Sequence, residues 1–352
     1  MRNGCGSHVI SIDMMLSRET RWRVPARVIG GPAAWRGPEL AGRTDWMVRL
    51  TDAHRAELSG ALAGLGEEPR PLREITAADF PLPTLAPVLS AAMADVLDGR
   101  GFVLLRGVPI EGLTEAQVEL MYWGIGRHLG RPIHQKSVDD LLVHVRNQGV
   151  DPNDPLVRGF QTADRLDYHC DSSDVVGLLC VRPAKAGGQS TIVSSVAVHD
   201  ELVRTRPQLA HLLHEQWWHD RKTGDGPESF FRCSVFGERD GRLFAHYGRA
   251  YMESAARGAG IPELTDDQVR ALDELDAVTN SPDFVLTMDF RPGDIQLLNN
   301  YTVMHARTAY EDYPEPERRR DLIRLWLVVD TDLGLPDDFA AAGIVARDVA
   351  FT

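Results

Sequence analysis

The sequence is poor in cysteine. Its four cysteines, Cys5, Cys170, Cys180 and Cys233, are scattered through 352 residues and include no CxxC pair. Such a set predicts neither a disulfide framework nor a structural zinc site, and it is typical of a protein from a reducing compartment.

A long hydrophobic run and an excess of positive charge are also missing. No stretch of about eighteen apolar residues occurs, and residues 1–20 lack the apolar core and cleavage site of a secretory signal. The net charge is −13, from 38 basic and 51 acidic residues, which argues against a broad surface for nucleic acid or an anionic membrane.

From these absences we expect a cytoplasmic protein with a small-molecule partner, no nucleic-acid partner and no membrane association. The oligomeric state is not indicated by the sequence. Residues 1–15 are expected to be disordered, and Met14 and Met15 leave the true start of the chain open.

What the chain does contain is a series of short apolar segments punctuated by glycine and proline. Apolar spacing predicts helices at residues 51–62 and 85–97, and the capping boxes at Thr114 and Thr265 mark the starts of two more. Strands are expected at residues 101–107, 176–181, 190–194, 243–247, 284–290, 294–298 and 322–329. So many strands with so few helices predict a mainly β or α+β fold, in which a double-sheet β core is flanked by helices.

A histidine and an acid lie two residues apart directly before one of these strands. His169 and Asp171, in the stretch YHCDSSDVV, have the period of an extended segment, so their side chains point to one side. His305 follows a later strand and a turn-like pair, Asn299 and Asn300. Two imidazoles and one carboxylate are the facial ligand set of a non-haem Fe(II) site, and zinc accepts the same ligands. The alternative interpretation of an isolated HxD pair is a polar strand end whose side chains are satisfied by hydrogen bonds.

Two arginines flank the apolar run near the end of the sequence. Arg320 and Arg324 lie at even spacing on an expected strand, so both guanidinium groups are expected to enter the cavity that holds the metal. A guanidinium binds a carboxylate through two hydrogen bonds and stays charged, which suits it to anchor a dicarboxylate co-substrate. Arg318 and Arg319 are expected to remain solvated.

The stretches YHCDSSDVVGLLC, AGGQSTIVSS, LLNNYTVMHAR and RRRDLIRLWL together resemble the TauD/TfdA family of Fe(II)/2-oxoglutarate-dependent dioxygenases, and within it the clavaminate-synthase-like branch. The resemblance runs from GFVLLRG to RLWLVV. It implies a double-stranded β-helix, or jelly roll, over residues 96–352, with residues 1–95 as an N-terminal elaboration packed on it in one structural unit.

The resemblance also implies the roles of individual residues. Fe(II) is expected at His169, Asp171 and His305, with 2-oxoglutarate and O2 as co-substrates. Arg320 is expected to hold the distal carboxylate of 2-oxoglutarate. A hydroxyl of the family's GGxT motif assists it; the motif reads GGQS here, so Ser190 holds the matching position and Thr191 follows it. Arg324 matches a second arginine, which lies near the iron-facing carboxylate of 2-oxoglutarate or near an anionic substrate group.

The implied reaction is oxidation of an aliphatic C–H bond with release of succinate and CO2. Hydroxylation is the default outcome, and desaturation or cyclisation is also compatible. A polar segment before His169 is expected to form a lid, and the candidate substrate contacts are Arg146, Asn147, Gln148, Arg165, Tyr247 and Arg249. Their polarity favours an amino-acid-like or carboxylate-bearing substrate. The competing interpretations are a zinc-dependent hydrolase with the same ligands and a non-catalytic β-sandwich binding module.

Overall fold

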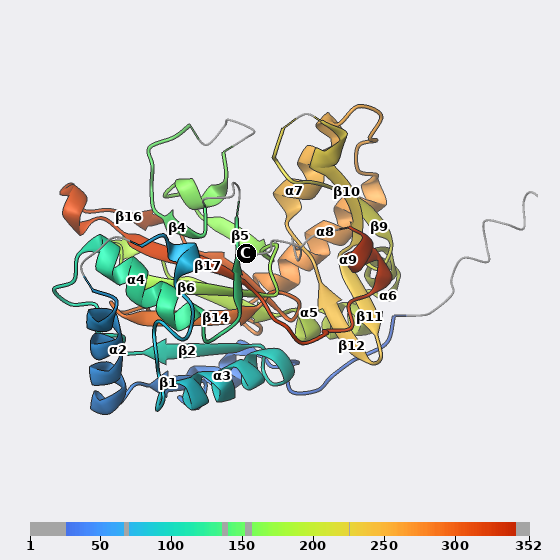
Figure 1. The fold of residues 1–352 in the computed structure, drawn as a ribbon. Coiled ribbons are helices and arrows are strands. Elements are labelled where there is room, and N and C mark those ends of the chain that lie inside the picture. Colours follow the sequence, from blue (N-terminus) through green and yellow to red (C-terminus); the bar gives the residue numbers. More distant parts are fainter. Residues whose placement is uncertain (1–25, 67–69, 136–139, 152–156, 225, 343–352) are drawn as a thin grey trace, which may run out of the picture.

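The computed structural model of the protein describes residues 26–66, 70–135, 140–151, 157–224 and 226–342. The disorder predicted for residues 1–15 concerns a segment outside these ranges. Within them the chain forms two main β-sheets with helices packed around them (Figure 1). The prediction of a double-sheet core flanked by helices is confirmed.

The larger sheet has the strand order β1-β2-β14-β6-β17-β3, and β4 also pairs with β17. β1 and β2 run parallel, and the other neighbours run antiparallel. The central strands β6 and β17 are covered on both faces, so apolar residues occupy both sides of each strand. The strands of this sheet are β1 (Met47–Arg49), β2 (Phe102–Arg106), β3 (Arg131–Ile133), β4 (Leu142–Val145), β6 (Val175–Arg182), β14 (Asp294–Asn299) and β17 (Asp321–Val328).

The smaller sheet has the antiparallel order β13-β8-β15-β5. Its inward residues, such as Ile192 and Val303, join the apolar core of the larger sheet, whereas Val193 and Met304 face outward into a second apolar cluster. The alternation of the strands therefore decides which side chains enter the space between the sheets. The strands are β5 (Leu166–His169), β8 (Ser190–Ser194), β13 (Leu286–Met288) and β15 (Val303–Arg307).

Three helices cover the larger sheet and lie together at the lower left of Figure 1: α2 (Asp52–Gly64), α3 (Ala86–Asp98) and α4 (Glu115–Gly126). α3 packs against β2 and β14, α4 packs against β17, and α2 packs on α4. The predicted capping box at the start of α4 is confirmed, because Gln117 Oε1 accepts a hydrogen bond from the Thr114 N–H at 2.9 Å. The predicted boundary between residues 95 and 96 falls inside α3.

Between β8 and β13 the chain makes a long insertion, which forms the right-hand part of Figure 1. Its apolar residues pack against the outer face of the smaller sheet. The sequence predicted a strand and a helix here but not the first two helices or the hairpin of β9 and β10. The insertion contains α5 (Ser195–Thr205), α6 (Pro207–Leu212), β9 (Gln216–Asp220), β10 (Phe230–Ser234), β11 (Phe236–Arg239), β12 (Arg242–Ala245), α7 (Arg249–Glu253) and α8 (Asp266–Thr279).

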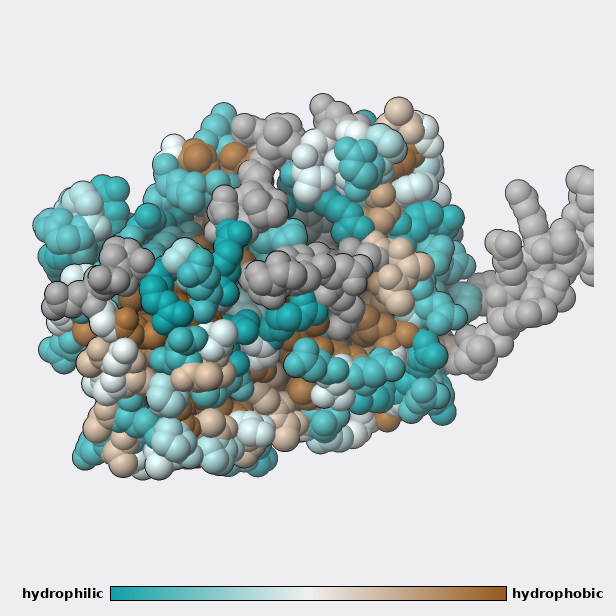
Figure 2. Space-filling view, viewed as in Figure 1, coloured by the Kyte–Doolittle hydropathy of each residue, from teal (hydrophilic) through white to brown (hydrophobic). Residues whose placement is uncertain are grey.

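The remaining elements are short. β7 (Ala186–Gly187) pairs with β16 (Tyr310–Glu311), and α1 (Gly37–Ala41) and α9 (Asp337–Ala341) lie near the two ends of the described chain. On the face shown in Figure 2, hydrophobic residues occur in small groups between hydrophilic ones. Among the helices in the described ranges, none has the length and apolar character needed to cross a membrane.

Candidate metal centre and active site

The two histidines predicted as metal ligands face each other across neighbouring strands. β5 and β15 pair with His169 directly opposite His305, and the centres of the imidazole rings are 4.2 Å apart. Asp171 lies where the chain leaves β5. Its carboxylate oxygens are 3.9 Å from Nε2 of His169 and 3.8 Å from Nε2 of His305. One ligand atom from each residue lies within 4.8 Å of the others, so the three groups converge on one point.

The hydrogen bond of His169 directs its second nitrogen toward Asp171. Nδ1 donates to the backbone carbonyl oxygen of Asp167 at 2.8 Å. A carbonyl only accepts, so this contact fixes the tautomer and leaves a lone pair on Nε2. Nδ1 of His305 is buried and has no hydrogen-bond partner in the described part of the chain. The orientation of His305 therefore depends on the packing of β15.

The protonation states suit a divalent metal. Burial lowers the pKa of His169 and lowers that of His305 to about 3. Burial also opposes ionisation of Asp171, but the Arg324 guanidinium and the two imidazoles outweigh it and hold the pKa of this carboxyl at about 2. At neutral pH the cluster offers two neutral imidazoles and one carboxylate, which is the form that binds Fe(II). The residues present therefore fit an iron ion.

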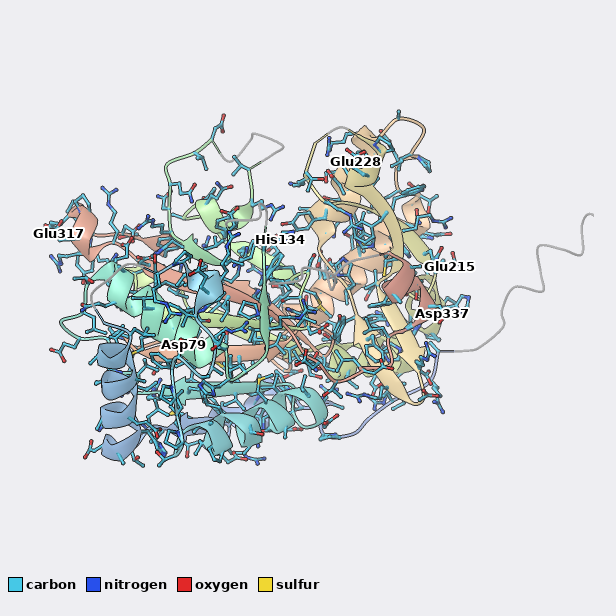
Figure 3. The ribbon with its side chains drawn as sticks, in the orientation of Figure 1. Asp79, His134, Glu215, Glu228, Glu317 and Asp337 are labelled. Atoms are coloured by element: carbon cyan, nitrogen blue, oxygen red, sulfur yellow. The ribbon has the colours of Figure 1, made fainter. Side chains whose placement is uncertain are left out.

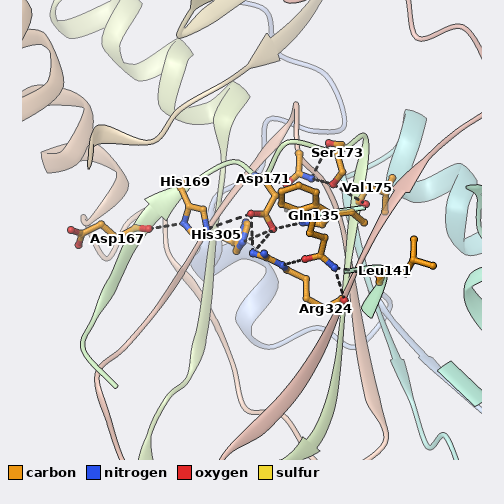
Figure 4. A network of polar contacts seen from close by, with 11 residues as sticks. Gln135, Leu141, Asp167, His169, Asp171, Ser173, Val175, His305 and Arg324 are labelled. Carbon is orange, nitrogen blue, oxygen red and sulfur yellow. Dashed lines mark hydrogen bonds and ion pairs between the residues drawn. The ribbon is translucent and has the colours of Figure 1, made fainter. Parts of the chain in front are cut away.

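Residues of β17 hold the carboxylate of Asp171 in place, as Figure 4 shows for Arg324. Trp326 Nε1 donates to Oδ2 of Asp171 at 3.0 Å, and Arg324 Nη1 lies 3.2 Å from Oδ1. The backbone N–H of Asp171 donates to the side-chain oxygen of Asn300 at 3.1 Å. Such outer contacts fix the direction of a ligating carboxylate.

Arg324 lies at the metal end of the site. Its Nε donates to Oε1 of Gln135 at 2.6 Å, and its guanidinium lies 5.0 Å from the ring centre of Phe160. The two roles predicted for this residue, contact with the iron-facing carboxylate of 2-oxoglutarate or with an anionic substrate group, stay predictions.

Arg320 belongs to a separate buried cluster together with Arg307, a residue that the sequence analysis did not single out. The two side chains are 4% and 5% exposed, and their guanidinium groups lie 5.0 and 4.8 Å from the ring centre of Tyr310. Nε and Nη1 of Arg307 lack hydrogen-bond partners in the described residues, and no carboxylate there forms an ion pair with either arginine. Burial and the nearby Arg320 lower the pKa of Arg307 to about 10. Buried charges are normally paired, so this cluster suits an anionic ligand.

The two candidate hydroxyls lie on opposite faces of β8. Ser190 pairs with Arg307 in the smaller sheet and faces the interior, where its Oγ donates to Oε1 of Gln296 at 3.1 Å. Thr191 faces outward, beside Tyr168. Of the two hydroxyls, that of Ser190 shares the interior with the arginine pair.

A cavity of about 520 Å³ opens in front of His169 and Asp171. Its wall includes Phe160, Trp326 and His134, the last of which is labelled near the centre of Figure 3. The wall also contains several arginines and a lysine, together with the acidic residues Asp167, Asp220 and Glu253.

Three of the predicted substrate contacts line this cavity, and each already has polar partners. Arg165 Nε donates to Asp167 at 2.9 Å. The hydroxyl of Tyr247 donates to Oδ1 of Asp276 at 2.6 Å, and Arg249 Nη1 donates to Oδ2 of the same carboxylate at 2.8 Å. Tyr247 and Arg249 therefore tie the cavity wall to α8.

The other three predicted contacts, Arg146, Asn147 and Gln148, are not part of the cavity wall. Arg146 is 45% exposed and turns toward Asp321, with its Nη1 3.8 Å from Oδ2. The side chains of Asn147 and Gln148 make hydrogen bonds within the loop, to the Gly149 N–H and to Gln161. The prediction that these three residues contact the substrate stays a prediction. The polarity of the segment did not indicate which side chains point inward.

A second group of histidine and carboxylates lies on the outer face of β4. Nδ1 of His144 is 2.8 Å from Asp321 and Nε2 is 3.0 Å from Glu119, with Glu115 4.0 Å away. The hydrogen bonds to Asp321 and then to Glu119 raise the pKa of His144 to about 9, whereas burial and, to a smaller extent, Arg146 oppose this. Because both ring nitrogens already have carboxylate partners, we interpret the group as a structural ion pair.

Comparison with known proteins identifies the family. The model of the family described as taurine catabolism dioxygenase TauD, TfdA family matches residues 68–326, well over half of the chain. FR-33289 synthase from Streptomyces rubellomurinus is 28% identical over 314 residues, covering 88% of this chain and 92% of that protein. A uridine-5'-phosphate dioxygenase from an Amycolatopsis species is 31% identical over 175 residues, covering 47% of this chain and 62% of that protein.

Solved structures show the same fold at lower identity. An asparagine oxygenase in complex with Fe(II), 2S,3S-3-hydroxyasparagine and succinate superposes with a TM-score of 0.60 at 19% identity, covering 80% of this chain and 93% of that one. The non-haem iron oxygenase OrfP in complex with Fe and alpha-ketoglutaric acid superposes with a TM-score of 0.60 at 18% identity. The superposition covers 81% of this chain and 94% of that one. The chain belongs to the TauD/TfdA family of dioxygenases and is an oxygenase that depends on Fe(II), 2-oxoglutarate and O2.

Proposed function

We propose that the protein oxidises an aliphatic C–H bond of a small, amino-acid-like or carboxylate-bearing metabolite, by hydroxylation unless the substrate directs desaturation or cyclisation. The observation that carries this proposal is that His169 and Asp171, two members of the cluster with His305, line a cavity of about 520 Å³ with basic side chains in its wall. A cavity of this size suits a small molecule, and its basic wall favours an anionic one.

In this proposal His169, Asp171 and His305 hold the iron. When bound, Fe(II) would activate O2, the oxidant, with 2-oxoglutarate as the reductant: one oxygen atom would end in succinate, with release of CO2, and the other oxidising equivalent would be spent on the C–H bond of the substrate. Trp326 and Arg324 keep the carboxylate of Asp171 in a fixed direction through the contacts at 3.0 and 3.2 Å. The protein contributes positioning and a cavity wall that excludes water.

We assign the distal carboxylate of 2-oxoglutarate to Arg320, with Arg307 as a second cationic contact and Ser190 as the hydroxyl donor. The support is that two buried guanidinium groups lack a carboxylate partner in the described residues, and that Ser190 faces the same interior. A carboxylate there would satisfy the free N–H groups of Arg307 and reduce the repulsion between the two arginines.

Similar proteins support a small anionic substrate. The structural neighbours were solved with hydroxylated asparagine and with (3S)-hydroxy-L-Arg, both of which carry a carboxylate. One relative is named for uridine-5'-phosphate, which carries a phosphate. The anionic group is the property that these molecules share.

The first test is an anaerobic titration of the protein with Fe(II) and 2-oxoglutarate, monitored by the weak visible charge-transfer band of the iron chelate. We expect the band in the wild type and in His54→Ala, a matched control on α2, and not in His169→Ala. Succinate release is then measured with a panel of amino acids and other small carboxylates. A band of normal intensity in His169→Ala would refute the assignment of the metal ligands.

The competing zinc-dependent hydrolase would use the same three ligands, but it leaves the buried pair of Arg320 and Arg307 without a role. Tight Zn(II) binding combined with no chelate band in the wild type would favour the hydrolase. The binding module without a metal predicts neither result.

A further inference from the structure

One wall of the cavity comes from the segment between β9 and β10. Lys222 lies in this segment and lines the cavity together with Tyr251 of α7. Its φ is +53°, a left-handed conformation that residues other than glycine, asparagine and aspartate rarely adopt. The Lys222 N–H donates to Oδ1 of Asp220 at 2.7 Å and thereby holds the turn. The ammonium group lies 5.4 Å from the ring centre of Tyr251. An unfavourable backbone conformation at a cavity wall points to a functional position.

The carboxylate of Asp220, two residues before Lys222, is shared with another cation. Arg257 donates to both oxygens of Asp220, at 2.7 and 2.8 Å, and Ser254 donates to Oδ2 at 3.0 Å. Both oxygens of Asp220 therefore already accept hydrogen bonds from Arg257, and Oδ2 accepts one more from Ser254. Asp220 attracts the ammonium of Lys222 through space, but no ion pair joins the two side chains.

Arg158 brings a second cation to the same place. Its Nη2 donates to the backbone carbonyl oxygen of Arg221 at 3.4 Å, next to Lys222 in the sequence. Its Nε is buried and has no hydrogen-bond partner in the described residues. Burial lowers the pKa of Lys222, Asp220 opposes this effect, and Arg158 lowers it further, so the two cations act on each other.

These two side chains differ from the other basic residues of the cavity wall that were predicted from the sequence. No carboxylate in the described ranges forms an ion pair with Arg158 or Lys222. The predicted residues do have such partners: Arg165 pairs with Asp167, Arg249 with Glu253, and Arg324 with Asp171. At this position of the cavity wall, two positive charges therefore lack a carboxylate partner among the described residues.

We propose that Arg158 and Lys222, beside the ring of Tyr251, form a subsite for a phosphoryl or phosphonyl dianion of the substrate. This inference rests on the proposed function, since it assigns the position of one substrate group in that cavity. The carbon to be oxidised would then lie between this subsite and the cluster of His169 and Asp171, which belong to the same cavity wall.

The charge and shape of the subsite favour a dianion over a carboxylate. Arg158 and Lys222 have no ion-pair partner among the described residues, so together they balance two negative charges, whereas a carboxylate supplies one. Three oxygens around phosphorus can accept hydrogen bonds from the fork of Arg158 and from the ammonium of Lys222 at the same time. A planar carboxylate bound to the guanidinium would leave the ammonium without a partner.

The test is calorimetric titration of the full chain, loaded with Fe(II) and 2-oxoglutarate under argon, with methylphosphonate, methyl phosphate and acetate. The variants are Arg158→Gln and Lys222→Asn, the second chosen because asparagine tolerates a left-handed backbone. Arg232→Gln, on the exposed side of β10, is the matched control. The visible chelate band is recorded in every sample to show that the metal site is intact.

We expect the wild type and Arg232→Gln to bind methylphosphonate about tenfold or more tightly than acetate, and each subsite variant to lose about tenfold, the effect of one charge-assisted hydrogen bond. The ratio between methylphosphonate and methyl phosphate distinguishes a phosphonate from a phosphate ester. Equal binding of acetate, no binding by the wild type, or unchanged binding by both variants would overturn the subsite. Loss of the chelate band in the wild type would instead overturn the proposed function, and the titration would still report on the subsite.

Discussion

Replacement of Arg320 by methionine separates the binding of 2-oxoglutarate from the stability of the fold. Arg320 is 4% exposed and has no carboxylate partner in the described residues, so its charge is not balanced by the protein. A charge-assisted hydrogen bond contributes about 1.5–3 kcal/mol, and truncation of one partner of a buried charge pair costs about 2–5 kcal/mol. If the substitution costs about 3 kcal/mol of binding free energy, a value within both ranges, we expect Arg320→Met to weaken 2-oxoglutarate binding roughly a hundredfold.

The same substitution should have little effect on stability without the co-substrate. Arg320→Met removes one hydrogen bond, from Nη1 to the Val145 carbonyl oxygen at 3.2 Å, which costs about 1 kcal/mol. It also relieves the repulsion with Arg307, and methionine fills the space with apolar atoms. We therefore expect the Tm of the metal-loaded variant to stay within about 3 °C of the wild type, and the rise in Tm on addition of 2-oxoglutarate to be lost.

The assay combines anaerobic titration of the chelate band with thermal unfolding, with and without 2-oxoglutarate. Arg319→Met is the matched control, because Arg319 is the exposed neighbour in the sequence. A normal 2-oxoglutarate affinity in Arg320→Met, or an equal loss in Arg319→Met, would refute the assignment of Arg320. A large fall in Tm without 2-oxoglutarate would show that the side chain has a structural partner instead.

Three further substitutions test neighbouring parts of the site. Trp326→Phe removes the indole N–H that bonds Asp171 at 3.0 Å, and we expect Fe(II) affinity, measured by titration, to fall about tenfold or more. Gly188→Ala strains a residue with φ of +70° and places Cβ 3.1 Å from Nε of Arg320, so we expect weaker 2-oxoglutarate binding with unchanged Fe(II) binding. The pKa of His144 is raised to about 9, so its contribution to stability is complete below the unfolded pKa of about 6.5 and is lost as the pH rises through about 9. His144→Leu should therefore flatten the fall in Tm between pH 7 and pH 10, and an unchanged profile would contradict the ion pair.

Much of the fold could be predicted because its signals are local. The strand of residues 190–194 has the predicted bounds, and the capping box at Thr265 begins α8 as expected, with Gln268 at the third position. These signals depend on neighbours within a few residues. The helices α5 and α6 and the hairpin of β9 and β10 depend on packing against the outer face of the smaller sheet, which no local pattern shows.

In the candidate site, too, some residues could be predicted from local sequence patterns and others could not. The spacing of His169 and Asp171 indicated a shared direction, and the pairing with His305 required only that two strands meet. Arg307 could have been found, because it lies two residues after His305 and an extended strand turns both side chains to the same face. Lys222 could not, since its role follows from a left-handed turn and from the pairing of Asp220 with Arg257.

The net negative charge of the chain and the basic residues of its interior affect an anionic ligand at different distances. The net charge of −13 repels an anionic ligand at long range, and salt screens this repulsion because the Debye length falls from about 30 Å at 0.01 M to about 8 Å at 0.15 M. The attraction of Arg320 and Arg307 acts inside the protein, where mobile ions do not enter. We therefore expect the association rate of 2-oxoglutarate, measured by stopped-flow absorbance of the chelate, to rise or stay constant as salt increases over this range. A severalfold decrease would mean that the basic cavity dominates the field outside the protein, in which case anions are steered toward it despite the acidic surface.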